Sequence, residues 1–157
     1  MKDIVCTIVF LIRDDEILLA MKQRGIGKGY WNGPGGKVEL DESVEQAMIR
    51  ECQEEIGVTP TVYKKVAYHD FILQNDKESW HQWTHVYLAS DWQGEPVPSD
   101  EMLPKWFNQA DIPYDHMWPD DILWLPQVLG DKLLQTRFVL AKNEQVEDYE
   151  ITEVPTL

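Results

Sequence analysis

The sequence is poor in cysteine and in basic residues. Its 2 cysteines, Cys6 and Cys52, have no CxxC spacing, so we expect reduced, buried thiols in a cytoplasmic protein rather than a disulfide framework. Lysine and arginine total 14 against 28 acidic residues, and the net charge is -14. A nucleic-acid polymer is therefore not expected as a partner, because phosphate backbones need a broad basic surface. A small phosphorylated ligand remains compatible with this composition if positive charge is gathered locally.

Long apolar runs, internal repeats and low-complexity segments are missing as well. The apolar run 4–12 is short and continues into a charged turn without a small-residue cleavage site, so it predicts a buried strand rather than a signal peptide. No run approaches membrane-spanning length, and no membrane partner is expected. The 157 residues, with 43% hydrophobic and 27% charged, predict one globular domain over 1–157. We expect this domain to be a monomer.

The stretch 36–58, GKVELDESVEQAMIRECQEEIGV, is the most informative part of the chain. It predicts a loop that leads into a helix over 43–56. Asp41 is the expected N-cap, and Gly57 followed by Pro60 is a stop signal.

Three glutamates of this helix, Glu51, Glu54 and Glu55, need an explanation. At about 100° per residue they fall on the buried stripe or at its edge, where an unpaired carboxylate is costly or takes up a proton. A bound cation would explain them, and oxygen ligands without Cys or His favour Mg²⁺ or Mn²⁺ over zinc. The alternative is a solvated acidic face. It is disfavoured because the polar side of the helix is already formed by Gln46, Arg50 and Gln53.

The segment 17–38 has a composition unlike the rest of the chain. It contains no acidic residue, but it holds 6 of the 9 glycines and the basic residues Lys22, Arg24, Lys28 and Lys37. Glycines let backbone N–H groups approach phosphate oxygens, so a phosphate cradle beside the glutamates is predicted. The alternative is a flexible surface loop with incidental lysines.

The remaining segments predict a mixed α/β domain. Apolar and alternating runs predict strands at 4–12, 16–23, 61–73, 81–90, 104–107, 133–141 and 145–154, and a second helix is expected over 120–129, possibly disturbed by Pro126. Polar loops are expected at 74–79, 91–99 and 111–119. His81 and His85 are interpreted as ordinary strand histidines rather than metal ligands.

The glutamate helix resembles the signature of the Nudix hydrolases, G-x5-E-x7-R-E-U-x-E-E-x-G-U, where U is a bulky aliphatic residue. The matching residues are Gly36, Glu42, Arg50, Glu51, Glu54, Glu55, Gly57 and Val58, with Cys52 as the one departure, at the first U. The resemblance implies an α/β/α sandwich with a mixed central sheet, which hydrolyses a pyrophosphate bond in a nucleoside diphosphate derivative by a metal-activated water. It implies Mg²⁺, or Mn²⁺, held by Glu51, Glu54, Glu55 and the carbonyl of Gly36, with Arg50 among the catalytic residues.

A second resemblance covers nearly the whole chain. The segments 22–25 (KQRG), 30–33 (YWNG), 98–102 (PSDEM) and 117–121 (MWPDD) are similar in order and spacing to mammalian MutT homologues that hydrolyse oxidised purine nucleoside triphosphates. This similarity implies Trp118 stacking on a base whose edge is read by Asn32, Asp120 and Asp121. It places Lys22 near the phosphates and Glu101 near the metal, as a ligand or as the general base, for which Glu54 and Glu55 are also candidates. The other residues expected to contact substrate are Thr7, Ile26 and Phe71.

Simpler interpretations exist for these residues. Trp118 could be a core residue, Asn32 a turn residue, and Asp120 with Asp121 first-turn acids favoured by the helix dipole. The expected function is hydrolysis of nucleotides of the 8-oxo-dGTP and 2-oxo-dATP type to the monophosphate and pyrophosphate, a sanitation of the nucleotide pool. The alternatives are another nucleoside diphosphate derivative, such as a nucleotide sugar, a dinucleoside polyphosphate or a capped RNA end, and a non-catalytic nucleotide sensor. The sensor ranks last because the glutamate cluster is whole.

Overall fold

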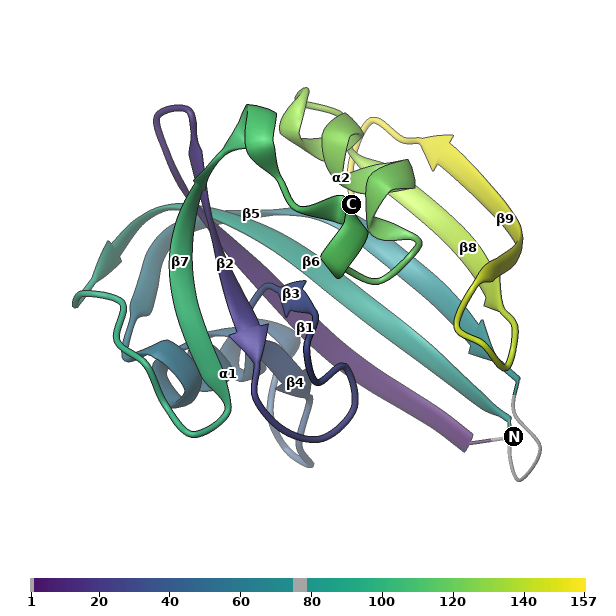
Figure 1. Ribbon diagram of the computed structural model, residues 1–157, viewed down its shortest axis with the longest axis horizontal. Helices are drawn as coiled ribbons and strands as arrows, with labels where there is room; N and C mark the ends of the chain where they lie inside the picture. Colours follow the sequence, from purple (N-terminus) through teal and green to yellow (C-terminus); the bar gives the residue numbers. More distant parts are fainter. Residues whose placement is uncertain (1, 75–78) are drawn as a thin grey trace.

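The computed structural model describes residues 2–74 and 79–157, which form strands and two α-helices (Figure 1). The elements follow the chain in the order β1 (Lys2–Arg13), β2 (Glu16–Lys22), β3 (Trp31–Asn32), β4 (Gly35–Lys37), α1 (Val44–Ile56), β5 (Thr59–Leu73), β6 (Trp80–Gln93), β7 (Met102–Asn108), two 3-10 turns (Gln109–Asp111 and Tyr114–His116), α2 (Asp121–Leu129), β8 (Leu134–Leu140) and β9 (Val146–Glu153). Among the described residues, no helix has the length and apolar character needed to cross a membrane.

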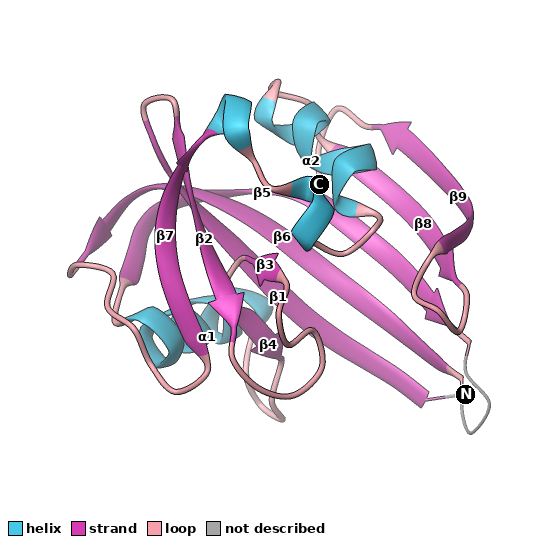
Figure 2. Ribbon diagram, viewed as in Figure 1, coloured by secondary structure: helices cyan, strands magenta, loops and turns pink. Residues whose placement is uncertain are grey.

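The strands form a mixed sheet with the order β3-β2-β1-β6-β5-β8-β9 (Figure 2). Strands β1 and β6 are parallel, and so are β5 and β8, whereas β1–β2, β5–β6 and β8–β9 are antiparallel. Strand β4 pairs with β1, and β7 pairs with β2. The predicted mixed sheet is therefore present.

The two helices cover opposite faces of this sheet, with α2 in front and α1 behind in Figure 1. Successive residues of a strand point to opposite faces. In β1, Phe10 accordingly packs in one apolar core with Trp124 of α2, while Val9 and Leu11 pack in the other core with Met48 of α1. Complete burial of one such side chain contributes about 1.5–3 kcal/mol. The two cores hold the sheet between the helices, as the predicted sandwich requires.

Helix α1 begins at a capping box on Ser43, two residues after the N-cap that the sequence predicted. The expected N-cap, Asp41, lies before the helix with φ of 65°. Ser43 is the N-cap: its hydroxyl accepts from the backbone N–H of Gln46 at 3.1 Å, and its own N–H donates to the Gln46 side chain at 2.9 Å. This reciprocal pair satisfies two helix-end donors, which one acid at position 41 could not do. The predicted stop at Gly57 is confirmed, with φ of 73°.

Strands β3 and β4 were not predicted, because both are very short and lie in the glycine-rich segment. Residues 35–37 pair with 6–8 of β1. A Cβ on Gly35 would lie 1.8 Å from the carbonyl oxygen of Thr7, so only glycine permits this pairing. The segment expected as a flexible loop or cradle is thus partly fixed in the sheet. The expected loop at 111–119 contains the second 3-10 turn, and most of the loop at 74–79 lies outside the described residues.

Candidate active site

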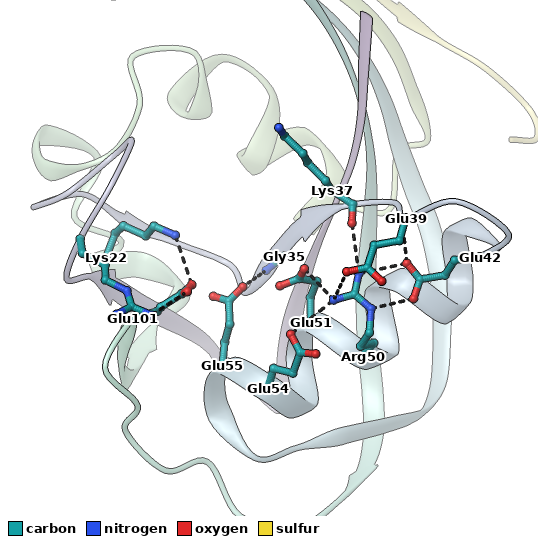
Figure 3. A network of polar contacts seen from close by, with 11 residues as sticks. Lys22, Gly35, Lys37, Glu39, Glu42, Arg50, Glu51, Glu54, Glu55 and Glu101 are labelled. Atoms are coloured by element: carbon teal, nitrogen blue, oxygen red, sulfur yellow. Dashed lines mark hydrogen bonds and ion pairs between the residues drawn. The ribbon is translucent and has the colours of Figure 1, made fainter.

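Arg50 of α1 lies at the centre of a group of glutamates (Figure 3). Its guanidinium forms a forked pair with Glu42, with Nε to Oε2 at 2.7 Å and Nη2 to Oε1 at 3.0 Å. Its Nη1 also donates to Glu51 at 2.9 Å and to Glu54 at 3.3 Å. The hydrogen bonds that Glu42 accepts from Arg50, together with one from the backbone N–H of Glu39, lower the pKa of Glu42 to about 2. The expectation that Arg50 belongs to the solvent side of the helix is therefore wrong, because pairing with these three glutamates draws its long side chain over them.

The three helix glutamates differ in depth. Glu55 is buried, Glu51 is mostly buried with 17% of its side chain exposed, and Glu54 is 58% exposed. Glu51 and Glu55 thus lie on the buried stripe, as predicted, whereas Glu54 lies at its edge, where it pairs with Arg50.

Glu55 has one satisfied and one unsatisfied oxygen. Its Oε1 accepts from the backbone N–H of Gly35 at 3.3 Å, whereas Oε2 is buried without a hydrogen-bond partner among the described residues. Burial, with a contribution from neighbouring Glu51, raises the pKa of Glu55 to about 8. Gly36 lies against the same group, because a Cβ there would be 2.6 Å from the carboxyl carbon of Glu51. Glycine at 36 lets β4 contact the acid cluster directly.

Glu101 lies across a cavity of about 490 Å³ from the helix glutamates. It pairs with Arg24 at 3.1 Å and with Lys22 at 3.6 Å, and these cations lower its pKa. Lys22 and Arg24 both line the cavity, as the predicted cradle requires. Lys28 and Lys37 are exposed, and Figure 3 shows the Lys37 side chain pointing away from the glutamates. We call this space the acid cavity.

A second space, the base cavity, has a volume of about 210 Å³ and lies between the sheet and the segment that precedes α2. Lys22 lines this cavity. So do all the other residues that were expected to contact the base or the rest of the substrate: Thr7, Ile26, Asn32, Phe71, Trp118, Asp120 and Asp121. Tyr30 packs edge-on against Trp118 with 5.3 Å between ring centroids. The base cavity and the acid cavity share Lys22, Gly35 and Gly36 in their walls, so they adjoin.

Asp120 and Asp121 form a buried pair. Each is less than 5% exposed, with values of 3% and 4%. Asp120 is the N-cap residue of α2 and Asp121 lies in its first turn, as the alternative interpretation expected. The Asp120 side chain, however, accepts a hydrogen bond from Trp124 Nε1 at 2.9 Å rather than capping the helix. Burial raises the pKa of Asp120 to about 6, and burial together with the charge of Asp120 raises the pKa of Asp121 further. We therefore expect the pair to hold one proton near neutral pH.

Comparison with known proteins assigns the family. A family model described as the NUDIX domain matches residues 2–128. The chain belongs to the Nudix family. It is 38% identical over 96% of each chain to the oxidized purine nucleoside triphosphate hydrolase of Danio rerio, and 35% identical over 94% of each chain to that of Mus musculus. The predicted enzyme class, a Nudix hydrolase of pyrophosphate bonds, is confirmed with the family.

Solved structures agree with the Nudix fold. A mutator MutT protein from Bacillus halodurans superposes with a TM-score of 0.83 at 24% identity, covering 94% of this chain and 97% of that one. A MutT NUDIX hydrolase from Burkholderia pseudomallei has a TM-score of 0.65 at 32% identity, covering 72% of this chain and 88% of that one.

The donor groups fit a divalent metal ion, although no three of the described His, Cys, Asp and Glu side chains converge into a finished metal site. Arg50 accounts for this difference, because it holds Glu51 and Glu54 in ion pairs. The observation in favour of a metal is the buried, unpartnered oxygen of Glu55 beside Glu51. Such an oxygen is costly unless a proton or a cation compensates it. With oxygen donors alone, the Nudix helix suits Mg²⁺ or Mn²⁺.

The sequence analysis did not identify several residues that line the base cavity. Strands β5 and β6 contribute a wall to the base cavity through His69, Leu73, Trp80, Gln82 and Thr84, and α2 contributes Trp124. A period of two along 69–73 and 80–84 is the signal that would have grouped them, because alternate residues share one face of the sheet. Phe71, which the resemblance implied as a substrate contact, lies on this face of β5.

Proposed function

We propose that this Nudix hydrolase converts oxidised purine nucleoside triphosphates, of the 8-oxo-dGTP and 2-oxo-dATP type, to the monophosphate and pyrophosphate with Mg²⁺ as cofactor. The observation that carries the proposal is the adjacency of the two cavities at Lys22, Gly35 and Gly36. A nucleotide could place its base beside Trp118 and the aspartate pair while its phosphates reach the glutamates. The names of the Danio rerio and Mus musculus relatives support the same substrate class.

The base cavity offers complementary groups to an oxidised purine. Trp118 provides an aromatic face for stacking. The aspartate pair, holding one proton, provides both a hydrogen-bond donor and acceptors. Asn32 accepts from the backbone N–H of Gly33 through Oδ1 at 2.8 Å, so its NH₂ group is the part that can donate to a base. These groups read a base edge, and a proton that either aspartate can hold allows oxidised guanine and oxidised adenine alike.

The acid cavity offers the groups that phosphoryl chemistry needs. Glu51, Glu54, Glu55 and the Gly36 carbonyl would hold the metal, with Glu101 on the opposite wall. The metal, when bound, neutralises phosphate charge and lowers the pKa of an attacking water. Lys22 and Arg24 are placed to share the charge of the phosphate oxygens. Arg50 acts as a positioning residue, because it fixes where Glu51 and Glu54 lie.

The general base is one of three glutamates that line the acid cavity, Glu54, Glu55 or Glu101. It accepts a proton from the attacking water while the leaving pyrophosphate is held by the basic residues.

A turnover panel tests the proposal. Purified protein is incubated with Mg²⁺ and ordinary or oxidised nucleoside triphosphates, a nucleotide sugar, a dinucleoside polyphosphate and a capped RNA end, with pyrophosphate and phosphate measured separately. We expect the highest kcat/KM for oxidised purine nucleotides, poor turnover of pyrimidines, and pyrophosphate as product. Equal turnover of ordinary and oxidised purines, or a preference for one of the other compounds, would contradict the proposed substrate.

A further inference from the structure

His69 lies in the middle of β5, fully buried, in the wall of the base cavity. Its Nδ1 is 2.6 Å from Oγ1 of Thr136, its register partner on the neighbouring strand β8. Its ring packs against Trp124 with 4.3 Å between centroids. Its Nε2 is buried and lacks a hydrogen-bond partner in the part of the chain that the structure describes. Buried polar atoms without partners are rare and costly, so Nε2 is a candidate for contact with a ligand.

The protonation state of His69 follows from its surroundings. Burial lowers its pKa to about 3, so the ring is neutral near pH 7 and carries one proton on one of its two nitrogens. Among the described residues, the side chain within hydrogen-bonding distance of the Thr136 hydroxyl is His69, through Nδ1. A buried hydroxyl needs an acceptor for its hydrogen, and Nδ1 is within reach. With Nδ1 accepting, the ring proton lies on Nε2, which becomes a donor.

The direction of Nε2 follows from the same bond. The two nitrogens of an imidazole point in divergent directions, so a ring with Nδ1 turned to β8 has Nε2 turned away from β8. On the other side of β5, the register partner of His69 is Thr84 of β6, which also lines the base cavity. The N–H of His69 is thereby placed in the sheet wall of the cavity.

A second unpartnered atom belongs to the aspartate pair. Asp121 Oδ2 is buried and has no hydrogen-bond partner among the described residues, and Asp121 lines the same cavity as His69. Trp124 contacts both His69 and the aspartate pair, since its ring lies against His69 and its Nε1 donates to Asp120. The cavity thus contains two unsatisfied hydrogen-bonding atoms, one on the sheet and one in the aspartate pair.

We propose that His69 is a specificity-determining residue whose Nε2–H donates a hydrogen bond to an acceptor on the bound base, either an oxo oxygen or a ring nitrogen of an oxidised purine. The inference rests on the proposed function, because it requires the base to occupy this cavity. An amino group at the same place on the base would bring two donors together and leave both unsatisfied. His69 therefore selects for an acceptor on the part of the base that is not read by the aspartates.

The test compares His69→Phe with His69→Gln. Phenylalanine keeps an aromatic ring against Trp124 and removes the N–H, whereas glutamine keeps a side-chain N–H. Calorimetry without added metal gives the Kd of the oxidised purine, ordinary purine and pyrimidine nucleoside monophosphates. We expect His69→Phe to weaken binding of the oxidised purine monophosphate by about tenfold or more, with a smaller change for the pyrimidine, and His69→Gln to regain part of the loss.

Pyrophosphate is the matched control ligand, because it can occupy only the acid cavity. Its inhibition constant against turnover should be the same in the wild type and both variants. An equal loss for all monophosphates would indicate a packing role and overturn the proposal, and so would an unchanged Kd in His69→Phe. If the wild type has no preference for oxidised purines, the proposed function fails before any variant is made, so the two failures are distinguishable.

NMR of the ¹⁵N-labelled wild type supplies a measurement that does not depend on a variant folding. We expect the His69 proton on Nε2, with a shift of the Nε2 resonance when the oxidised purine monophosphate binds. A proton on Nδ1, or an Nε2 resonance that does not respond to the ligand, would overturn the assignment of His69 as a donor.

Discussion

Trp124 donates a hydrogen bond from its indole Nε1 to Asp120 Oδ2 at 2.9 Å, four residues earlier in the chain. A donor stabilises the charged form of a carboxyl group, so this bond opposes the rise in the pKa of Asp120 that burial causes. Burial, together with the negative charge of Asp120, raises the pKa of Asp121 further. The two adjacent aspartates are thereby unequal, and the shared proton is favoured on Asp121 in the free protein. A ligand that offers a donor or an acceptor can redistribute this proton.

The first prediction concerns base selection by the aspartate pair. Asp120→Asn replaces an ionisable group by a neutral amide, so the pair can no longer move its proton to suit either base. We expect a strong loss of kcat/KM for oxidised guanine or oxidised adenine nucleotides, and a changed ratio between the two. The measurement is steady-state kinetics of both substrates in the wild type, Asp120→Asn and Asp121→Asn. An unchanged ratio and an unchanged KM in both variants would remove the base-reading role.

The second prediction concerns pH and stability. Because the pKa of Asp121 is higher in the folded protein than its ordinary value of 3.8, the folded state binds more protons than the unfolded state above about pH 4. The free energy of unfolding should therefore fall as the pH rises from about 4 through about 6, the pKa of its partner Asp120, and beyond. Asp121→Asn removes this titration. We expect it to be more stable than the wild type at pH 8, by about 1 kcal/mol or more, while its activity falls.

Denaturant unfolding at several pH values measures this difference. Asp115→Asn is the matched control, because Asp115 is exposed nearby and should leave the pH profile of stability unchanged. Glu55 also has a raised pKa, but it is present in the wild type and in both variants, so it cancels in the comparison. The free energy of unfolding could instead change in parallel in the wild type and Asp121→Asn from pH 4 to 8. That result would show that the aspartates are ionised in the folded protein.

The long periodic segments were predictable from the sequence. Both helices and the strands β1, β2, β5, β6, β7, β8 and β9 were found within a few residues of their bounds, because each has a helical period, a continuous apolar run or an alternating pattern. Strands β3 and β4 were missed because each gains its conformation from a neighbour rather than from its own residues. Gly35 pairs in the sheet because, without a Cβ, it can lie close to the backbone of Thr7. No local sequence pattern encodes this contact.

The candidate site was predictable in composition but not in depth. Helical spacing identified the glutamates as a group, yet it could not show that Glu54 is exposed while Glu55 is buried, since this depends on how α1 packs on the sheet. It also placed Arg50 in solvent, because a helical projection ignores the reach of a long side chain back to Glu42. His69 gave no signal, since a single histidine in an apolar strand has many ordinary explanations.

The third prediction concerns metal and stability. A cation bound to Glu55 and its neighbours in the folded state stabilises that state by linkage, and at 100 times its Kd the gain is about 2.7 kcal/mol. We expect Mg²⁺ to raise Tm in the wild type. Glu55→Gln should reduce this rise and should itself be more stable than the wild type without metal, because it no longer buries an unpartnered carboxyl oxygen beside Glu51. Differential scanning calorimetry with Mg²⁺ and with EDTA tests both statements, and an equal Mg²⁺ response in the two proteins would contradict the assigned ligand.

The last prediction separates catalysis from stability at two adjacent residues. Glu54→Gln and Glu55→Gln each remove one charge from the wall of the acid cavity, and we expect each to lower kcat by about 10³-fold or more with Mg²⁺. Their effects on stability should differ, because Glu54 is largely exposed and Glu55 is buried. Only Glu55→Gln should change Tm in EDTA. Glu45→Gln is the control on the same helix: Glu45 is exposed, accepts from the Tyr63 hydroxyl at 3.0 Å, and does not line the acid cavity, so near-normal kcat is expected. Near-normal turnover in both Glu54→Gln and Glu55→Gln would show that the chemistry does not depend on these carboxylates.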